Sequence, residues 1–226
     1  MNSISNRLQD ILATIQSAKS SAHATQSINL LAVSKMQSPL AIREAFSAGQ
    51  MLFGENYCQE ALEKQSLLSD LAIEWHFIGP IQSNKTQLIA QHFDWVHSID
   101  RLKIAQRLND ARPDNLDPLQ VCIQVNISNE ENKSGIAQQD LESLADAISK
   151  LPRLKLRGLM AIPRPSKDIN TQRLQFKLVR ECYDNLLAKG FALDTLSIGM
   201  SDDYRIAIEQ GATIVRIGSA LFGARK

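Results

Sequence analysis

Short apolar segments alternate with longer amphipathic segments along almost all of the 226 residues. The apolar segments do not alternate cleanly between polar and apolar residues, which is typical of strands buried on both faces of a parallel sheet. Each is followed by a segment with helical periodicity or by a final turn. The pattern therefore predicts eight strand–helix units, with strands near residues 30–33, 51–53, 74–78, 95–97, 119–125, 154–161, 193–198 and 212–217.

Eight such units predict an α/β fold, a single (β/α)8 TIM barrel, and barrels of about 200–250 residues usually form one domain. A doubly wound sheet would have fewer strands and a GxGxxG motif after the first, which this sequence lacks. We find no Gly/Ser-rich or Pro-rich linker and therefore predict one domain over residues 1–226. Within residues 1–21, one helical face carries apolar residues, which predicts an extra N-terminal helix on the barrel: Ile4, Leu8, Ile11, Leu12 and Ile15.

Composition excludes several classes of function. The 25 basic and 24 acidic residues give a net charge of +1, so we expect neither nucleic-acid nor membrane-surface binding. No apolar run reaches the length of about 18 residues that a transmembrane helix needs, and no signal peptide is recognisable. Cys58, Cys122 and Cys182 form no CxxC pair, which predicts a reducing, cytoplasmic location. Nothing in the composition suggests an oligomer, so a monomer is the default expectation.

Polar residues gather at the predicted carboxyl ends of the strands, where TIM barrels place their sites. The sequence has no HExxH motif, Walker A loop or GxSxG motif, and its carboxylates do not cluster with metal-ligand spacing. We therefore predict no metal site. The polar residues at these ends are Lys35, Asn56, His76, Asn126, Ser201, Arg216, Gly218 and Ser219.

Lys35 directly follows the first apolar segment. A lysine that is partly removed from water can carry a neutral amine, which attacks a carbonyl group and forms a Schiff base. The alternative is a solvated loop lysine, the commoner situation for this residue type. Lys133, in a polar loop over the predicted mouth, has the same two interpretations, and solvation is its default.

Two glycine turns follow the last two strands. Residues 216–219 (RIGS) and 199–201 (GMS) combine glycine with a hydroxyl group, and free backbone N–H groups at such turns can bind an anion. The same place in TIM barrels is a recurrent phosphate site. The alternative is that both are ordinary strand-to-helix turns. His76, between Trp75 and Phe77, is interpreted as a packed, hydrogen-bonded core residue rather than a catalyst.

A set of motifs appears in a fixed order along the chain: LAVSK at 31–35, FGENY at 53–57, WHFIGPIQSNK at 75–85, KSG at 133–135, GLM at 158–160, LSIGMSDD at 196–203 and RIGSALFG at 216–223. Taken together, these motifs resemble the pyridoxal phosphate homeostasis protein family over essentially the whole chain. Small departures from the family pattern are Ile198 in place of methionine, Ser219 in place of threonine, and Ile81 in place of leucine; serine keeps the hydroxyl group.

The resemblance implies a single barrel related to the N-terminal barrel of alanine racemase. It implies binding of pyridoxal 5′-phosphate (PLP), a role in intracellular PLP homeostasis, no established turnover, and transient contact with apo PLP-dependent enzymes. It places the Schiff base on Lys35. The remaining cofactor-binding residues that it implies are Ser201, Gly218 and Ser219 for the phosphate, Arg216 at the pyridine nitrogen, Asn56 beside the ring and Met160 in the pocket wall.

Two enzyme classes are alternatives. A PLP-dependent amino-acid racemase with weak activity would need an acid/base group on each face of the ring. In alanine racemase, the resemblance implies, a tyrosine from a second β-rich domain supplies one, and we expect no such domain here. Of the tyrosines Tyr57, Tyr183 and Tyr204, only Tyr57 is predicted near the mouth. A Schiff-base aldolase would usually carry its lysine on a later strand, with an acid/base carboxylate nearby.

Overall fold

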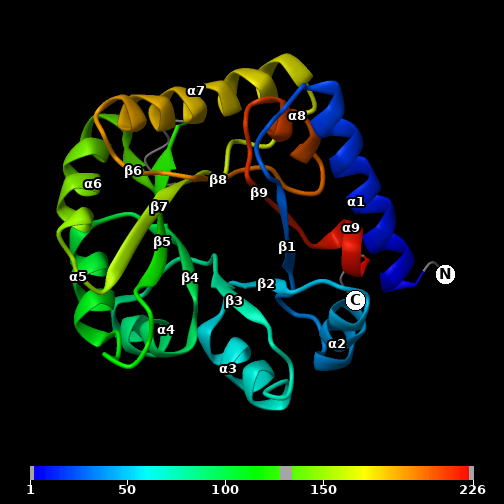
Figure 1. Cartoon of the computed structure of the whole chain (residues 1–226), viewed down its shortest axis with the longest axis horizontal. Coiled ribbons are helices and arrows are strands. Elements are labelled where there is room, and N and C mark those ends of the chain that lie inside the picture. The colour runs from blue at the N-terminus through cyan, green and yellow to red at the C-terminus, as the bar shows by residue number, and fades with distance from the viewer. Residues whose placement is uncertain (1–2, 128–133, 224–226) are drawn as a thin grey trace.

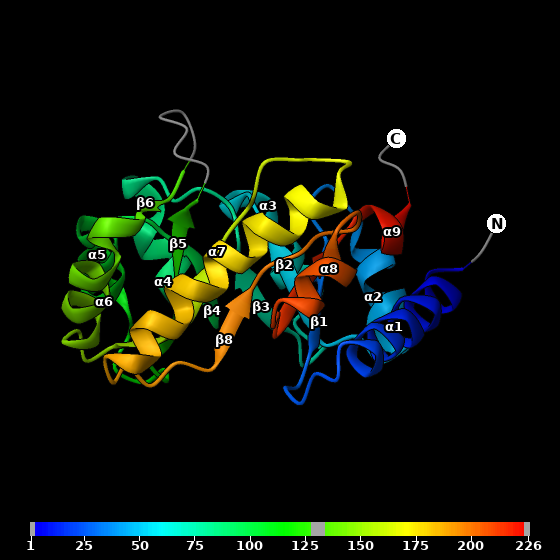
Figure 2. The ribbon, with the colours of Figure 1, turned by 90° about the horizontal axis from the view of Figure 1, so that it is seen from above.

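A computed structural model describes residues 3–127 and 134–223, and these form a closed parallel barrel with helices around it (Figure 1). Eight strands of the described chain make up the barrel, in the order β1-β2-β3-β4-β5-β7-β8-β9, and β9 pairs with β1 to close it. The predicted (β/α)8 fold is confirmed. The arrowheads of β5 and β8 point to the same side of the barrel, where the carboxyl ends of the strands lie (Figure 2).

The bounds of the elements follow chain order. The strands are β1 Asn29–Val33, β2 Leu52–Glu55, β3 Glu74–Phe77, β4 Trp95–Ile99, β5 Leu119–Asn126, β6 Ile136–Ala137, β7 Leu154–Met160, β8 Thr195–Ser197 and β9 Ile214–Ile217. The helices are α1 Ile4–Ser21, α2 Pro39–Ser47, α3 Cys58–Leu67, α4 Thr86–His92, α5 Leu102–Ala111, α6 Leu141–Ser149, α7 Ile169–Ala188, α8 Tyr204–Glu209 and α9 Ser219–Phe222.

Strand register determines which turns become neighbours. Ala32 of β1 pairs with Ile217 of β9 on one side and with Phe53 of β2 on the other. The turns that follow β9, β1 and β2 therefore lie next to one another at the same end of the barrel. The glycine turn after β9 and the lysine turn after β1 are brought together in this way, although about 180 residues separate them in the sequence.

The N-terminal helix covers one side of the barrel, as predicted. α1 lies against α2, α8 and α9 (Figure 1). Ser3 caps it by accepting a hydrogen bond from the Asn6 amide, and Ile4, Leu8, Ile11 and Ile15 are buried on its inner face. Leu12, predicted on the same face, is 40% exposed because it lies at the edge of that stripe. Within the described residues, no helix is both long and apolar enough to cross a membrane.

Two sequence predictions about local structure need correction, and one short strand was not predicted. The seventh predicted strand, β8, is shorter at both ends. The eighth, β9, begins two residues later than predicted, because the apolar residues just before β8 and β9 belong to loops. The two-residue strand β6, which pairs with β5 outside the barrel ring, was not predicted. His76 is not at a strand end: it lies within β3 and is fully buried in the barrel interior.

Candidate functional site

Lys35 lies in a turn that directly follows β1, and its side chain is half-buried. The backbone of this turn is tightly determined. The Ser34 amide donates to the Gly54 carbonyl of β2 at 3.0 Å, and Met36 has a φ of +61°, in the left-handed region that a residue with a side chain rarely adopts. Such a conformation persists only where the surroundings hold it, so this turn is held from outside.

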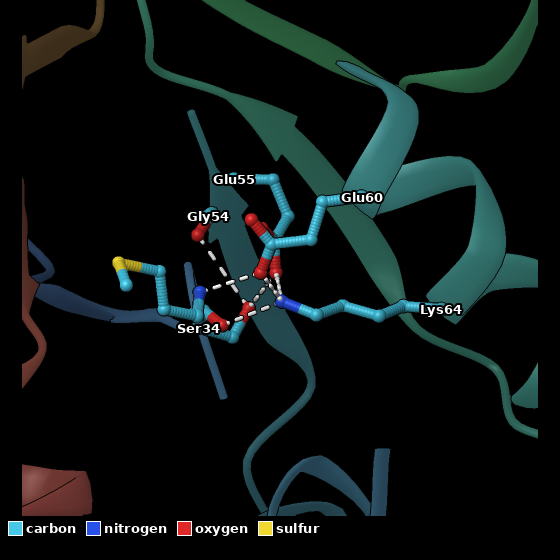
Figure 3. Close-up of polar contacts among 6 residues, drawn as sticks. Ser34, Gly54, Glu55, Glu60 and Lys64 are labelled. Carbon is cyan, nitrogen blue, oxygen red and sulfur yellow. Dashed lines mark hydrogen bonds and ion pairs between the residues drawn. The ribbon is translucent and has the colours of Figure 1, made fainter. Parts of the chain in front are cut away.

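An ion cluster centred on Lys64 contacts Ser34, the residue before Lys35 (Figure 3). Lys64 of α3 donates to the Ser34 carbonyl at 2.7 Å and to Glu55 Oε1 at 2.8 Å. Glu60 also pairs with Lys64, and it accepts a hydrogen bond from the Met36 amide. The residue before Lys35 and the residue after it are therefore tied to the same ammonium group. We call Glu55, Glu60 and Lys64 the turn clamp.

Because the charges of Glu55 and Lys64 are buried, the turn clamp is stable only when both are present. The side chains of Lys64 and Glu55 are 6% and 0% exposed, so each charge depends on the other for stabilisation. Burial raises the pKa of the Glu55 carboxyl, and the hydrogen bonds from Lys64 and Ser34 oppose that rise. Ser34 Oγ donates to Glu55 Oε1 at 2.6 Å. Loss of the cation would leave a carboxylate in the barrel wall without compensation.

Asn56 follows β2 and lies beside this turn. Its Oδ1 atom is buried and accepts no hydrogen bond from any residue that the structure describes. The backbone of Gly79 approaches it closely: a Cβ at position 79 would lie 2.2 Å from the Asn56 carbonyl oxygen. A buried acceptor without a donor is costly in a folded protein, so it marks a place where a ligand donor fits.

The turns after β8 and β9 bring two hydroxyl groups together. Ser219 Oγ donates to Ser201 Oγ at 3.3 Å, although the two residues come from different turns. Gly218 lies against the end of β1, because a Cβ there would be 3.2 Å from the Val33 carbonyl oxygen. Gly199 has a φ of +90°, which lets the chain turn sharply toward Ser201. The predicted grouping of Ser201, Gly218 and Ser219 is present.

Arg216 is a buried cation on β9, with 4% of its surface exposed. Its Nη1 atom donates to the carbonyl and to the hydroxyl of Ser197, the latter at 2.9 Å, and Nη2 donates to the Ala161 carbonyl at 2.9 Å. Burial lowers its pKa to about 10, and the Asp203 carboxylate opposes that change. Of its five N–H donors, those of Nε and one of Nη2 have no acceptor among the described residues.

Three further residues singled out in the sequence are Met160, Asn126 and Lys133. Met160, at the end of β7, is fully buried in a small cluster with Trp95 and Cys122. Asn126 ends β5, as predicted, and is half-buried. Lys133 lies outside the described residues. The structure thus brings Lys35, Asn56, Ser201, Arg216 and Ser219 to one end of the barrel. It places Met160 in the barrel interior, and the binding roles of all these residues remain predictions.

Comparison with known proteins gives one consistent answer. A model of the family described as "Alanine racemase, N-terminal domain" matches residues 7–226. The pyridoxal phosphate homeostasis protein of Pseudomonas aeruginosa is 55% identical over the whole chain and 97% of its own length, and that of Vibrio cholerae is 53% identical over the whole chain and 98% of its own length. The chain belongs to the pyridoxal phosphate homeostasis protein family. The resemblance noted from the motifs is therefore confirmed.

Solved structures place the pyridoxal phosphate homeostasis family among related barrels. PipY of Synechococcus elongatus, solved with PLP bound, has a TM-score of 0.82 and 36% identity, and the alignment covers 92% of this chain and all of PipY. Alanine racemase of Corynebacterium glutamicum has a TM-score of 0.69 at 16% identity, with 95% of this chain and 60% of the racemase covered. The racemase comparison shows a shared barrel fold.

The turn clamp of this family member was not predicted from the sequence. Glu60 and Lys64 look like a solvated pair four residues apart on a helix, the commonest situation for such residues. One signal was available: Lys64 lies three residues after Ala61 and four before Leu68, both buried, so it shares the apolar face of α3. A lysine on such a face needs a buried partner. Glu55, at the end of β2, is that partner.

Proposed function

We propose that this protein binds PLP at the carboxyl end of its barrel, holds it as a Schiff base on Lys35, and takes part in intracellular PLP homeostasis without catalytic turnover. The observation that carries the proposal is the meeting of a lysine turn and a paired-hydroxyl glycine turn on the adjacent strands β1 and β9. An aldehyde reactive toward an amine and a phosphate group are the two features that PLP offers to such a pair.

The residues present fit this ligand. The buried Oδ1 of Asn56 has no donor among the described residues, and the ring hydroxyl of PLP could supply one. Arg216 keeps N–H donors that the described protein does not use, and these suit the pyridine nitrogen as an acceptor. Ser201, Ser219 and the backbone around Gly218 would hold the phosphate. Met160 would line the pocket on the side of the barrel interior.

PLP supplies the aldehyde and a ring that can draw electrons from a bound amine. Arg216 limits how strongly the ring can draw electrons. Arg216 is a donor that stays charged, so it favours an unprotonated ring nitrogen, which draws electrons weakly. We infer that the site is built for retention and release of PLP rather than for chemistry on an amino acid.

The tyrosines support the same choice over the racemase alternative. Tyr183 on α7 and Tyr204 on α8 are buried, with 7% and 8% of their surfaces exposed, and neither follows a strand. Tyr57 follows Asn56 and is 55% exposed, so solvent surrounds more than half of its surface. A two-base racemase needs both acid/base groups held against the two faces of the ring. We propose that the protein acts as a monomer that passes PLP to apoenzymes in the cytoplasm.

Equilibrium dialysis against PLP and pyridoxal, followed by incubation with L-alanine and with an apo PLP-dependent enzyme, tests the proposal. We expect retention of PLP, recovery of the apoenzyme's activity, and no D-alanine. Failure to retain PLP would contradict the proposal outright. Steady formation of D-alanine by wild type, abolished in Tyr57→Phe, would replace it with the racemase alternative.

A further inference from the structure

A row of hydrogen-bonded side chains crosses the interior of the barrel and reaches Arg216. His76 of β3 and His97 of β4 lie 2.9 Å apart, Nδ1 to Nε2, and His97 Nδ1 lies 2.9 Å from Ser197 Oγ. Arg216 Nη1 lies 2.9 Å from the same hydroxyl. At the other end, His76 Nε2 lies 2.8 Å from Glu74 Oε1. We call these five residues the axial chain.

The axial chain joins the two ends of the barrel. Glu74 is the first residue of β3, its side chain is 44% exposed, and it lines a cavity of about 200 Å³ on the side opposite the PLP site. Arg157 and Asp194 line the same cavity. His76, His97 and Ser197 are fully buried. The only solvent-exposed member is thus Glu74, and Arg216 is at the far end.

The two end groups fix the direction of every hydrogen bond between them. Arginine can only donate and a carboxylate can only accept, whereas a neutral histidine has one donor and one acceptor. Arg216 must donate to the Ser197 oxygen, so the Ser197 hydroxyl donates to His97 Nδ1. His97 Nε2–H then donates to His76 Nδ1, and His76 Nε2–H donates to Glu74.

The opposite direction fails at both ends. It would leave the Ser197 hydroxyl without an acceptor, and it would place a lone pair of His76 against the Glu74 carboxylate. Both histidines must also be neutral: a second proton on His76 would face the Nε2–H of His97, and a second proton on His97 would face the hydroxyl hydrogen of Ser197. Burial lowers the pKa of His76 and lowers that of His97 further, in agreement with this arrangement. Glu74 and Asp94 favour protonation of His76, and Arg216 disfavours protonation of His97.

The packing around the histidines holds their rings in place. His76 stacks on Trp95 with ring centres 5.4 Å apart and an angle of 9° between the planes. Arg157 covers Trp95 at 4.8 Å from its ring centre and is paired with Asp194 at 2.6 Å. Stacking on Trp95 thus restricts rotation of the His76 ring and favours the hydrogen bonds described above.

We propose that Glu74, His76 and His97 are positioning residues for Arg216: through the Ser197 hydroxyl they hold the guanidinium in the orientation that presents its unused donors to the ligand ring. This inference rests on the proposed function. A row of hydrogen bonds that all point the same way strengthens each of its members, and the negative charge of Glu74 polarises the row toward the buried cation. Glu74 therefore influences the site from the opposite end of the barrel.

Nitrogen-15 NMR of the ligand-free protein, with labelled histidines at pH 7, tests the axial chain without any cofactor. We expect both His76 and His97 to be neutral and protonated on Nε2. We also expect Glu74→Gln to shift the signals of His97, which Glu74 does not touch. An Nδ1–H tautomer or an imidazolium at either position would overturn the proposal, even if PLP binds as proposed.

PLP affinity provides the second readout. Glu74→Gln should weaken PLP binding about fivefold, roughly the difference between a charge-assisted and a neutral hydrogen bond, because glutamine keeps the acceptor but removes the charge. Asp146→Asn removes an exposed carboxylate of α6 that contacts neither the axial chain nor the residues packed on it, and its affinity should stay within about twofold, as for an uncoupled site. In an Arg216→Lys background, Glu74→Gln should have no further effect. Independent, additive effects of Glu74→Gln and Arg216→Lys would overturn the proposal. Absence of PLP binding in wild type would instead contradict the proposed function.

Discussion

The buried ammonium of Lys64 lies 2.7 Å from the backbone carbonyl oxygen of Ser34, the residue that precedes Lys35. Through Glu60, the same ammonium is also linked to the amide of Met36, the residue that follows Lys35. The reactive lysine proposed here is therefore held by its backbone, from a helix that lies outside the barrel wall. This arrangement makes Lys64 a structural requirement for the placement of Lys35.

Lys64→Met should destabilise the protein by about 3–5 kcal/mol, because removing one member of a buried ion pair leaves the other charge uncompensated. It should also slow PLP attachment, since the turn around Lys35 loses its support. Urea denaturation measures the first effect and the rate of PLP uptake the second. Lys150→Met is the matched control: Lys150 is 71% exposed and pairs with Asp146, so its loss should cost at most about 1 kcal/mol. Equal effects of the two changes would contradict the role of the turn clamp.

Gly199→Ala should destabilise the turn that carries Ser201. A left-handed conformation costs a residue with a side chain about 1–2 kcal/mol, and forcing extra atoms into a packed site costs about 1–3 kcal/mol more. Gly199 and Gly190 both have a φ of +90°, but a Cβ at 199 would lie 2.6 Å from Ala207 Cβ, whereas a Cβ at 190 meets nothing within 4 Å. Gly190→Ala should therefore show only the smaller loss in thermal denaturation. Similar losses would show that close packing at Gly199 is unimportant.

Ser201→Ala and Ser219→Ala should each weaken PLP binding by about 1 kcal/mol, the usual net contribution of one hydrogen bond, or somewhat more if the bond is charge-assisted. The two hydroxyls are assigned to the phosphate, so neither change should alter the affinity for pyridoxal. Isothermal titration with both ligands measures the difference. Equal losses for PLP and pyridoxal would place the phosphate elsewhere.

The two barrel histidines predict a dependence of stability on pH. Burial lowers the pKa of His76 and His97 in the folded protein. The unfolded chain therefore binds more protons below the ordinary histidine pKa of about 6.5, so folding stability must fall as the pH falls through this range. Between pH 7.5 and 5.5 we expect a loss of about 1–3 kcal/mol.

Denaturation curves at the two pH values measure this loss. The double variant His76→Gln/His97→Gln should be less stable at pH 7.5 but should lose much less on acidification. His92→Gln, at an exposed position on α4, should keep the wild-type dependence on pH. A wild-type stability that does not change between pH 7.5 and 5.5 would show that the buried histidines do not stay neutral.

The barrel and the proposed site were predictable because both follow from local patterns. Lys35, Ser201 and Ser219 each come directly after an apolar strand, and parallel strands bring their ends together without further information. The exact ends of the strands could not be predicted from the sequence. The loops before β8 and β9 contain apolar residues such as Leu193 and Ala212, which extend the apolar pattern beyond the strands that form.

The turn clamp and the axial chain could not be read from the sequence because they depend on contacts between distant residues. His97 and Ser197 are one hundred residues apart, and no motif near either residue indicates that they form a hydrogen bond. The sequence predicts that His76 is a packed, hydrogen-bonded residue, and its contacts with His97 and Glu74 confirm this. Its partners became visible only in three dimensions, since inward-facing side chains of β3, β4 and β8 meet inside the barrel.

The most direct test of the proposed function is to add PLP to the purified protein, reduce it with borohydride, and map the modified peptide by mass spectrometry. We predict one pyridoxyl group, fixed on Lys35, and none in a Lys35→Ala variant whose circular dichroism matches wild type, since Lys35 lies in a turn after β1 rather than inside the barrel. Absence of an adduct in wild type, or an adduct on another lysine such as Lys133 that persists in Lys35→Ala, would contradict the proposed function.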